Sequence, residues 1–329
     1  MSAAAAPSSS GSTWRPTAPR ATLARRAELL LETRRFFAER DVLEVETPLL
    51  CAATVPDLHL ASVPVRLAAF DAPLYLQTSP EAAMKRLLAA GSGPIYQIAR
   101  AFRDGEVGSR HNPEFTLVEW YRPGFDDHRL IGEVEELLAR LLPSPLRAKS
   151  AQRWRYRELF RDRLGSDPLT DPVERLREVA GAGAPAELDR DDLLAFLLSH
   201  RIEPTFPPDR LVFVHDFPAS QAALARIAAD PEGDPVARRF EAWAGGLELA
   251  NGYWELSDPV EQRSRFERDL RERKNRGLPA VPIDERLLTA LEEGLPDCAG
   301  VALGFDRVVM LAAGANRIEE VLSFAIAHA

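Results

Sequence analysis

The stretch that decides the fold is residues 298–314, which read CAGVALGFDRVVMLAAG. The run of small and apolar residues predicts a buried strand, and Gly304 predicts a turn. We expect a helix to follow, opened by Asp306 and closed near Gly314. Arg307 then lies at a helix N-terminus, where free N–H groups and the helix dipole favour an anion. Taken alone, the GFDR string also fits a capping turn with an incidental salt bridge.

Upstream, two further stretches have the pattern of strands. Residues 95–103 (IYQIARAFR) and 114–121 (EFTLVEWY) flank a polar, Gly-containing segment. This pattern predicts an antiparallel hairpin with a long loop. Period two places a ring, a leucine, a carboxylate and a phenol on one face of the second strand. They are Phe115, Leu117, Glu119 and Tyr121. Such a face is more typical of a pocket wall than of a core.

Nearer the N-terminus, apolar residues recur at helical spacing and predict a helix over residues 22–40. Alternation over residues 42–50 predicts a strand, and Pro48 suits a sheet edge or an interface. Without other signals, an ordinary helix and strand is the simplest interpretation of this region.

The middle of the chain, residues 123–239, is rich in Ala, Arg, Asp and Pro and carries no motif that we can name. We expect helices over residues 130–142 and 191–200, and strands over 211–214 and 247–256. Asp258 is expected to cap a helix that runs to about Arg276. The basic cluster on this helix is most simply a solvated face. It consists of Arg271, Arg273, Lys274 and Arg276.

The overall composition indicates a globular protein. Of 329 residues, 46% are hydrophobic, which suffices for a large core. The formal charge of −9 argues against a broad basic surface for nucleic acid. Cys51 and Cys298 lack metal-binding spacing and are expected to be reduced thiols.

The sequence also leads us to expect a soluble, cytoplasmic protein. Residues 1–20 are rich in Ala, Ser and Pro, and we interpret them as a disordered leader rather than a signal peptide. No later run reaches the roughly 20 apolar residues that a membrane span needs. We therefore expect no membrane partner.

Three signals occur in a fixed order: a helix and strand ending in Pro48, a hairpin carrying FRDGE and HNPEF, and a terminal strand and helix with GVALGFDR. This order resembles motifs 1, 2 and 3 of class II aminoacyl-tRNA synthetases, and the spelling is closest to the lysyl enzyme. Three further strings support the lysine branch: TSPEAAMKR (78–86), HNPEFTLVEWY (111–121) and ELANGYWELSDP (248–259). The resemblance implies an α+β catalytic domain over residues 21–329, with an antiparallel sheet flanked by helices.

Two features narrow the resemblance. Only about twenty residues precede the motif 1 helix, so we expect no anticodon-binding domain of the OB type. The EWYRP ending of motif 2 and the ALG spelling of motif 3 are similar to the elongation factor P lysine ligase family. That family resembles a lysyl-tRNA synthetase core and attaches (R)-β-lysine to one lysine of elongation factor P. The resemblance implies ATP and Mg²⁺ as cofactors, (R)-β-lysine or lysine as substrate, no tRNA, and a homodimer.

Adenylate formation brings a carboxylate against the α-phosphate of ATP, so fixed guanidinium groups are needed to neutralise the charge. The resemblance implies that Arg103 bridges these groups and that Arg307 lies by the adenine and γ-phosphate. Phe115 resembles the ring that stacks on adenine, and Glu248, with Glu241, resembles the carboxylates that hold Mg²⁺. The remaining nucleotide-site residues implied by the resemblance are Asp104, Gly105, Glu106, His111, Asn112, Leu249 and Gly304.

A diamino acid requires oxygen ligands at both ammonium groups, because an unpaired desolvated cation is costly. By resemblance, Ser79, Pro80 and Glu81 face the amine near the carboxylate. The side-chain end is lined by Glu255, Tyr121 and Asn251, and Tyr253 packs along the methylenes or belongs to the core. Ala302 replaces a glycine typical of lysyl-tRNA synthetases, and we hypothesise that its methyl favours a β-amino acid.

One position departs from the family pattern. The acid expected two residues after Arg103 is replaced by Gly105, so Glu106 or backbone groups must read the adenine amino group. Two alternative functions stay open: a tRNA-charging enzyme and a non-catalytic regulatory paralogue. The acidic charge argues against the first, and the joint retention of Arg103, Glu248, Glu255 and Arg307 argues against the second. An amide-forming ligase of the asparagine synthetase type would not need the carboxylates at the lysine end.

Overall fold

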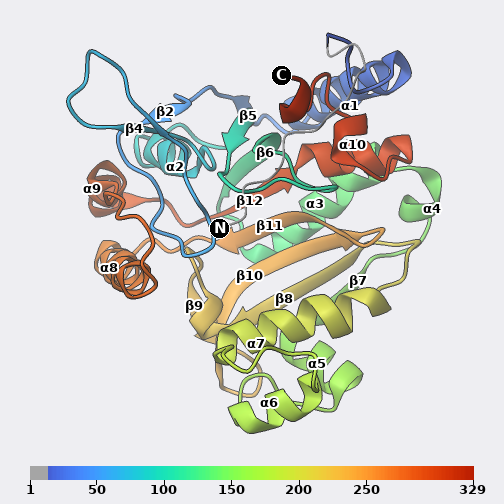
Figure 1. Ribbon diagram of the computed structural model, residues 1–329, viewed down its shortest axis with the longest axis vertical. Helices are drawn as coiled ribbons and strands as arrows, with labels where there is room; N and C mark the ends of the chain where they lie inside the picture. Colours follow the sequence, from blue (N-terminus) through green and yellow to red (C-terminus); the bar gives the residue numbers. More distant parts are fainter. Residues whose placement is uncertain (1–13) are drawn as a thin grey trace.

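The computed structural model describes residues 14–329 and is built around a nine-stranded, mostly antiparallel sheet (Figure 1). The strand order is β1-β5-β6-β12-β11-β10-β8-β7, and β9 pairs with β10. A small second sheet has the order β2-β4-β3. The strands are β1 (Leu43–Glu44), β2 (Leu50–Cys51), β3 (Pro64–Val65), β4 (Leu74–Leu76), β5 (Ile95–Phe102), β6 (Glu114–Pro123), β7 (Gln152–Arg155), β8 (Val212–Pro218), β9 (Ile227–Ala229), β10 (Pro235–Ala244), β11 (Leu247–Trp254) and β12 (Cys298–Gly304).

Helices flank the sheet, which confirms the predicted α+β class. They are α1 (Arg20–Ala38), α2 (Glu81–Ala89), α3 (Asp127–Leu141), α4 (Ser144–Arg147), α5 (Tyr156–Leu164), α6 (Val173–Ala180), α7 (Arg190–Leu197), α8 (Pro259–Asn275), α9 (Glu285–Gly294) and α10 (Phe305–Ala313). None of those that the structure describes is long and apolar enough to cross a bilayer. Helices α1, α3 and α10 cover one face of the sheet, where Phe37, Trp120 and Phe305 belong to the largest buried cluster.

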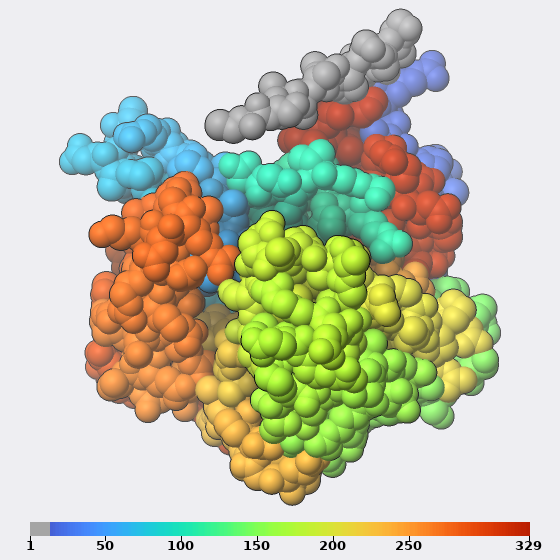
Figure 2. Space-filling model, turned by 60° about the horizontal axis from the view of Figure 1, so that its bottom comes forward, coloured from blue at the N-terminus to red at the C-terminus, as the bar shows by residue number. Residues whose placement is uncertain are grey.

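Two smaller cores support the other parts of the molecule. Helices α5, α6 and α7 bury Tyr156, Phe160 and Phe217 against the β8–β10 end of the sheet. Helices α2, α8 and α9 share a third cluster that includes Met84 and Phe266. In Figure 2 these two groups come forward side by side, α5–α7 in yellow-green and α8–α9 in orange. Because the α1–α3–α10 layer occupies one face, the opposite face of the central strands is left for a site.

Several predicted elements are confirmed. The hairpin is present as β5 and β6, which pair antiparallel from Ile95 opposite Tyr121 to Phe102 opposite Glu114. Helix α8 begins after Asp258, whose carboxylate accepts hydrogen bonds from the backbone N–H groups of Val260 and Glu261. The predicted helix over 191–200 corresponds to α7 followed by a π-helical turn at Leu198–Ile202.

Three predictions near these elements are wrong. The strand expected over 42–50 is reduced to β1 and β2, and only β1 joins the central sheet, parallel to β5. Asp306 does not cap α10: Gly304 is the N-cap, and the Asp306 carboxylate instead binds Arg26 at 2.6 Å and the backbone N–H of Thr116 at 2.8 Å. Arg273 is not on a solvated face but buried, and its guanidinium donates to backbone carbonyls.

The first described residues lie against the C-terminal segment. Residues 1–13 of the predicted leader lie outside the described residues. Within the described part, the backbone N–H groups of Thr17 and Ala18 donate to carbonyls of Ser323 and Leu322. Ala18 is also buried. This end of the predicted leader therefore packs against the C-terminal segment.

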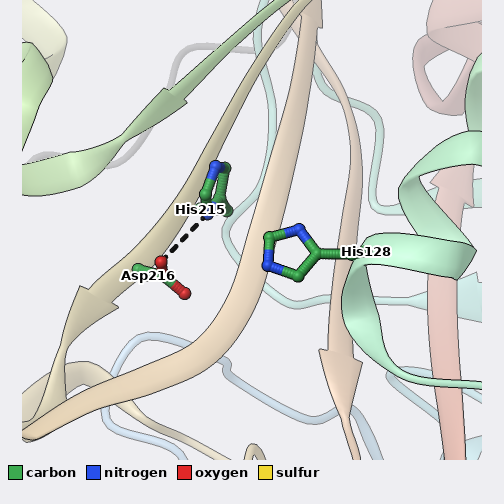
Figure 3. Close-up of side chains that lie close together, drawn as sticks. All are labelled: His128, His215 and Asp216. Atoms are coloured by element: carbon green, nitrogen blue, oxygen red, sulfur yellow. Dashed lines mark ion pairs between the residues drawn. The ribbon is translucent and has the colours of Figure 1, made fainter. Parts of the chain in front are cut away.

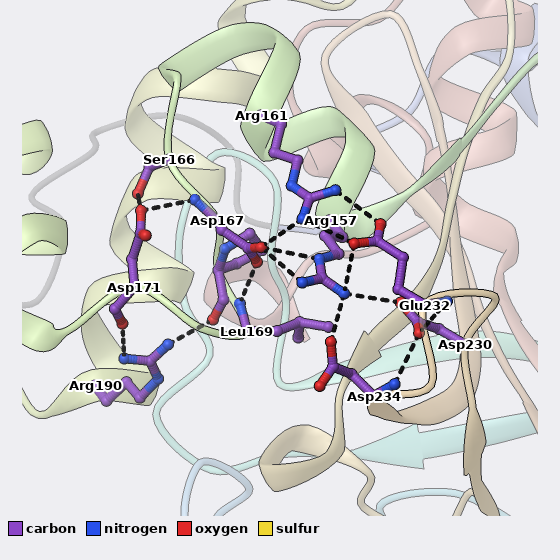
Figure 4. Close-up of polar contacts among 11 residues, drawn as sticks. Arg157, Arg161, Ser166, Asp167, Leu169, Asp171, Arg190, Asp230, Glu232 and Asp234 are labelled. Atoms are coloured by element: carbon purple, nitrogen blue, oxygen red, sulfur yellow. Dashed lines mark hydrogen bonds and ion pairs between the residues drawn. The ribbon is translucent and has the colours of Figure 1, made fainter.

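The middle region, which lacked a motif, is held together by an arginine-centred network (Figure 4). The Arg157 side chain on α5 is 7% exposed and reaches Asp167 at 2.8 Å, Asp234 at 2.6 Å and Asp230 at 3.3 Å. Burial acts to raise the pKa of Asp167, but hydrogen bonds from Arg157 and neighbouring groups hold that pKa well below its ordinary value. One buried cation thus ties α5 to the turn between β9 and β10.

We predict that Arg157→Leu lowers the free energy of unfolding by about 3–5 kcal/mol, because several buried or half-buried carboxylates lose their counter-charge. Urea denaturation at neutral pH measures this change. Arg175→Leu is the matched control, since Arg175 forms only an exposed pair with Glu178; its effect is expected to stay below about 0.5 kcal/mol. Equal effects of the two substitutions would show that the network stabilises the protein no more than an exposed ion pair does.

Candidate active site

The free face of the central sheet carries a cavity of about 560 Å³. Its floor is formed by β6, β12, β11 and β10, and its walls come from the hairpin loop, residues 57–60 and the start of α2 and α10. Both polar and apolar side chains line it. They are Asp57, His59, Leu60, Ser79, Glu81, Arg103, Glu106, Arg110, His111, Asn112, Phe115, Thr116, Leu117, Ala223, Arg239, Glu241, Glu248, Leu249, Ala250, Asn251, Tyr253, Ala302, Gly304, Asp306, Arg307 and Ile318.

Strand register arranges the floor in two rows. In the first row, Glu119 pairs with Ala302, Ala302 with Asn251, and Asn251 with Glu241. In the second row, two residues along each strand, Tyr121, Gly300, Tyr253 and Arg239 are paired in the same way. Because side chains two apart share a face and strands lie about 4.8 Å apart, both rows belong to the face of the sheet that carries the cavity. The sheet thus gathers residues from positions 119 to 302.

Gly300 has no room for a side chain in this floor. A Cβ atom there would lie 2.3 Å from Cε1 of Tyr121 and 2.5 Å from Oε1 of Glu255. The small residues of the AGVALG strand are therefore needed to let the Tyr121 ring and the Glu255 carboxylate approach the sheet. Ala302, the next residue on the same face, keeps only a methyl group between Glu119 and Asn251.

At one end of the cavity two guanidinium groups flank an aromatic ring. Arg103 follows β5, lies 4.9 Å from the ring centroid of Phe115, and is 3.5 Å from Glu106. Its buried Nε atom has no hydrogen-bond partner among the described residues. Arg307, in the first turn of α10, donates to the Glu248 carbonyl at 2.8 Å and lies 3.7 Å from the Glu248 carboxylate. This end is suited to an anion beside a planar group.

The backbone conformation of Gly105 explains why this position of the hairpin loop lacks the acidic residue of the family pattern. Gly105 has a φ of +79°, a left-handed value that an acidic residue adopts only with strain. The next residue, Glu106, is the one whose side chain lines the cavity. Asp104 is fixed through its backbone N–H, which donates to Ala61 at 2.8 Å. The carboxylate in this loop is thus displaced by one position relative to the family pattern.

The other predicted loop residues differ in their contacts. His111 accepts a hydrogen bond from Arg307 at 2.9 Å, and burial together with the Arg307 charge lowers the pKa of the imidazole. Asn112 is buried, and its amide donates to the Glu114 carbonyl at 2.6 Å and accepts from the Ile326 N–H at 3.0 Å. Although Asn112 lines the cavity, both its polar atoms are engaged with backbone.

Three carboxylates lie close enough to interact at the β10–β11 side of the cavity. Burial, and next the charge of Glu248, raise the pKa of Glu241 above its ordinary value. The same two causes raise the pKa of Glu203 to about 7. Arg239 compensates part of this charge by donating to Glu241 at 2.6 Å. A bound cation would reduce the repulsion between the carboxylates of such a cluster and favour their ionised forms.

At the opposite end, a buried lysine bridges two acids. The Lys85 ammonium lies 2.6 Å from Glu81 and 2.6 Å from Glu255, and its side chain is 2% exposed. Burial alone would lower the pKa of Lys85, but Glu255 and Glu81 raise it above its ordinary value. Burial also raises the pKa of Glu255, against the effect of Lys85. Glu255 therefore lies behind the cavity wall rather than on it.

Glu119 is the buried carboxylate next to this pair. It accepts hydrogen bonds from Ser79 Oγ at 2.8 Å and from the Tyr121 hydroxyl at 2.8 Å. Burial, and next the charge of Glu81, raise the pKa of Glu119 to about 8. The pKa of Tyr121 is raised by burial and by Glu119. Three acids thus share one cation here, which leaves an excess of negative charge that suits an amine.

The structure brings most predicted site residues to this cavity. Those that do not line it are Pro80, Asp104, Gly105, Tyr121 and Glu255.

Sequence reasoning missed Lys85, Arg110, Arg239 and residues 57–60. The Lys85 pair was detectable as a Glu–Lys pair at helical i,i+4 spacing. Arg239 lay at the end of the region without a motif. Glu119 was assigned to the correct strand face but not to the site.

We predict that Lys85→Met lowers the free energy of unfolding by about 3–5 kcal/mol, because Glu81 and Glu255 lose their buried counter-charge. Burial already raises the pKa of Glu255 against the effect of Lys85, so without Lys85 the folded-state pKa of Glu255 rises further above that of the unfolded chain. Protonation relieves the penalty at low pH, so the loss of stability grows as pH increases from 6 to 8. Chemical denaturation across this range tests both points.

The exposed Lys274→Met substitution serves as the control and is expected to change stability by less than about 0.5 kcal/mol. A penalty for Lys85→Met that does not vary with pH would contradict the proposed pairing.

The chain is similar throughout to known proteins. The profile of the family "tRNA synthetases class II (D, K and N)" matches residues 12–328. A relative from Klebsiella pneumoniae (strain 342), "Elongation factor P--(R)-beta-lysine ligase", is 51% identical over 96% of this chain and 98% of its own length. A relative of the same name from Yersinia pestis (strain Pestoides F) is 50% identical over 95% of this chain and 97% of its own.

Proposed function

The chain belongs to the elongation factor P (R)-β-lysine ligases within the class II tRNA synthetases, and from this premise we propose that it activates (R)-β-lysine with ATP and transfers it to elongation factor P. The acceptor is the ε-amino group of one lysine of that protein. The protein is a ligase of the synthetase type.

The observation that carries the proposal is the division of one cavity into two chemically different ends. Arg103, Phe115 and Arg307 form an end suited to a nucleotide phosphate and a base. Glu81 lines an end suited to ammonium groups, and the buried Glu119 carboxylate lies behind that end, hydrogen-bonded to Ser79. The floor between them is a continuous sheet surface. A carboxylate held near the middle would thus lie beside a phosphate.

The residues present fit ATP and Mg²⁺. Arg307 at the start of α10 and Arg103 supply fixed positive charge for the phosphates, and the Phe115 ring supplies a stacking surface for adenine. Glu241 and Glu248 would hold Mg²⁺, which supplies charge neutralisation on the phosphates when bound. Glu106 is the side chain available in the loop for the adenine amino group.

At the amine end, Ser79 and Glu81 line the cavity and would receive the ammonium groups of the amino acid, and Glu119 would support them from behind through Ser79. Asn251 supports this assignment, because its buried Oδ1 atom lines the cavity without a hydrogen-bond partner among the described residues. Tyr253, which lies in the second row, would contact the methylene groups. Glu255 and Lys85 would act behind this surface by fixing the position of Glu81.

The chemistry proceeds in two transfers. The substrate carboxylate oxygen attacks the α-phosphorus of ATP, and pyrophosphate leaves. The acceptor ε-amine then attacks the carbonyl carbon, a C–N bond forms, AMP leaves with the former bond electrons, and the amine loses a proton. Arg103 neutralises the charge that develops as the two anions meet in the first step. Loss of such a donor is expected to cost about 3 kcal/mol in the transition state.

We predict that the protein exchanges pyrophosphate into ATP with (R)-β-lysine, and that elongation factor P gains one β-lysyl residue in intact-mass measurement. Arg103→Gln should slow exchange by on the order of 100-fold, since it removes about 3 kcal/mol of stabilisation. Arg100→Gln is the matched control, because Arg100 lies on the same strand and pairs with Glu114 at the surface. Exchange without added mass on elongation factor P would point instead to tRNA as acceptor, and no exchange with any lysine isomer would refute the proposal.

Ala302 is proposed to set the preference for the β-amino acid. Its methyl lies in the first row between Glu119 and Asn251, on the floor of the amine end. We predict that Ala302→Gly shifts the ratio of adenylation efficiencies toward α-lysine by roughly 10-fold, the discrimination that one methyl group typically supplies. Parallel kcat/KM measurements with both isomers test this, and an unchanged ratio would remove the role.

A further inference from the structure

A second group of chemically active side chains lies on the opposite face of the sheet from the cavity. His215 and Asp216 lie in the middle of β8, and His128 comes from the first turn of α3 (Figure 3). Each offers a metal-binding atom, and these atoms all lie within 4.8 Å of one another. The group borders a separate cavity of about 510 Å³. We propose that His128, His215 and Asp216 bind one divalent transition-metal ion of the zinc class.

A β-bulge creates this arrangement. Phe240 of β10 lies opposite His215 and Ala237 lies opposite Phe217, so two β10 residues face the single residue Asp216. Asp216 also has a φ of +57°. Bulges of this kind redirect side chains and are frequent next to functional sites. Here the bulge lets consecutive residues, His215 and Asp216, direct their side chains to the same point.

An unsatisfied imidazole nitrogen supports a ligand at that point. His215 is 8% exposed and Asp216 is 4% exposed. Within the described residues, His215 Nδ1 has no hydrogen-bond partner of good geometry, whereas Asp216 Oδ1 lies 3.2 Å from the Arg238 guanidinium. Nδ1 lies 3.2 Å from Oδ2 of Asp216. Ligands of a tetrahedral ion with bonds of about 2.1 Å are about 3.4 Å apart, so this pair already has the required spacing.

The third ligand and the charge balance are also favourable. His128 is exposed, so its ring is free to turn by the small amount that closes the triangle. Arg238 lies 2.8 Å from Asp127 and 3.2 Å from Asp216, and Asp126 adds to the charge it experiences. Three carboxylates thus surround one guanidinium. The other charged residues that line this cavity, Arg153, Arg155, Glu158 and Asp230, balance one another, so a divalent cation would offset the remaining negative charge. Two imidazoles and a carboxylate are the ligands zinc prefers, with a fourth position open to the cavity.

Cobalt(II) titration of the full-length protein, freed of metal and carrying no histidine tag, tests the site. We expect one Co²⁺ per chain with the visible absorption of a four-coordinate ion, displaced by Zn²⁺. His128→Ala and Asp216→Asn should each weaken Co²⁺ binding by about 100-fold or more, beyond what loss of a supporting partner costs. His128 is exposed, so its variant keeps the test valid if Asp216→Asn fails to fold.

Two controls separate this site from others. His200→Ala removes an exposed imidazole elsewhere and should leave the absorption unchanged. Glu248→Gln should also leave it unchanged, because the carboxylates of the first cavity offer only oxygen ligands and favour six-coordinate ions. The proposal is overturned if the absorption is missing, if it persists in both His128→Ala and Asp216→Asn, or if it disappears in Glu248→Gln. The result does not depend on ligase activity.

Discussion

The antiparallel register of β6, β12, β11 and β10 is the constraint on which the rest of the structure depends. A shift of one residue in any of these strands would turn its cavity-facing side chains toward the α1–α3–α10 core. Backbone hydrogen bonds and the buried face opposite the cavity together fix that register. The row from Glu119 to Glu241 therefore stays aligned without any direct contact between its two ends.

A rigid floor allows the site to concentrate charges that would otherwise separate. Carboxylates with raised pKa values occupy both ends, and each end has only partial compensation from Lys85 or Arg239. Such an arrangement of carboxylates lowers the stability of the protein without ligands. It becomes favourable when cationic ligands bind and neutralise the carboxylates. The proposed reaction supplies a cation at each end, an ammonium group and a metal ion.

The middle region and the reverse face show how much of the molecule lies beyond the motifs. Arg157 pairs with four acids and so anchors the helical segment beside the sheet. On the face opposite the active-site cavity, the bulge at Asp216 brings two histidines and an aspartate together. Neither arrangement has a recognisable spacing along the chain, because its members come from elements far apart in sequence.

The sequence by itself determined the fold class, the hairpin, the α8 cap and most residues of the candidate site, because these depend on local periodicity and on motifs that keep their order. It did not determine the short β1 and β2, the role of Asp306 or the burial of Arg273. Asp306 depends on its long-range partner Arg26, and Arg273 depends on the backbone carbonyl of Asp57. Only the tertiary structure placed Glu255 behind the wall and Lys85 between two acids. Contacts of this kind arise when distant segments pack, and no local pattern encodes them.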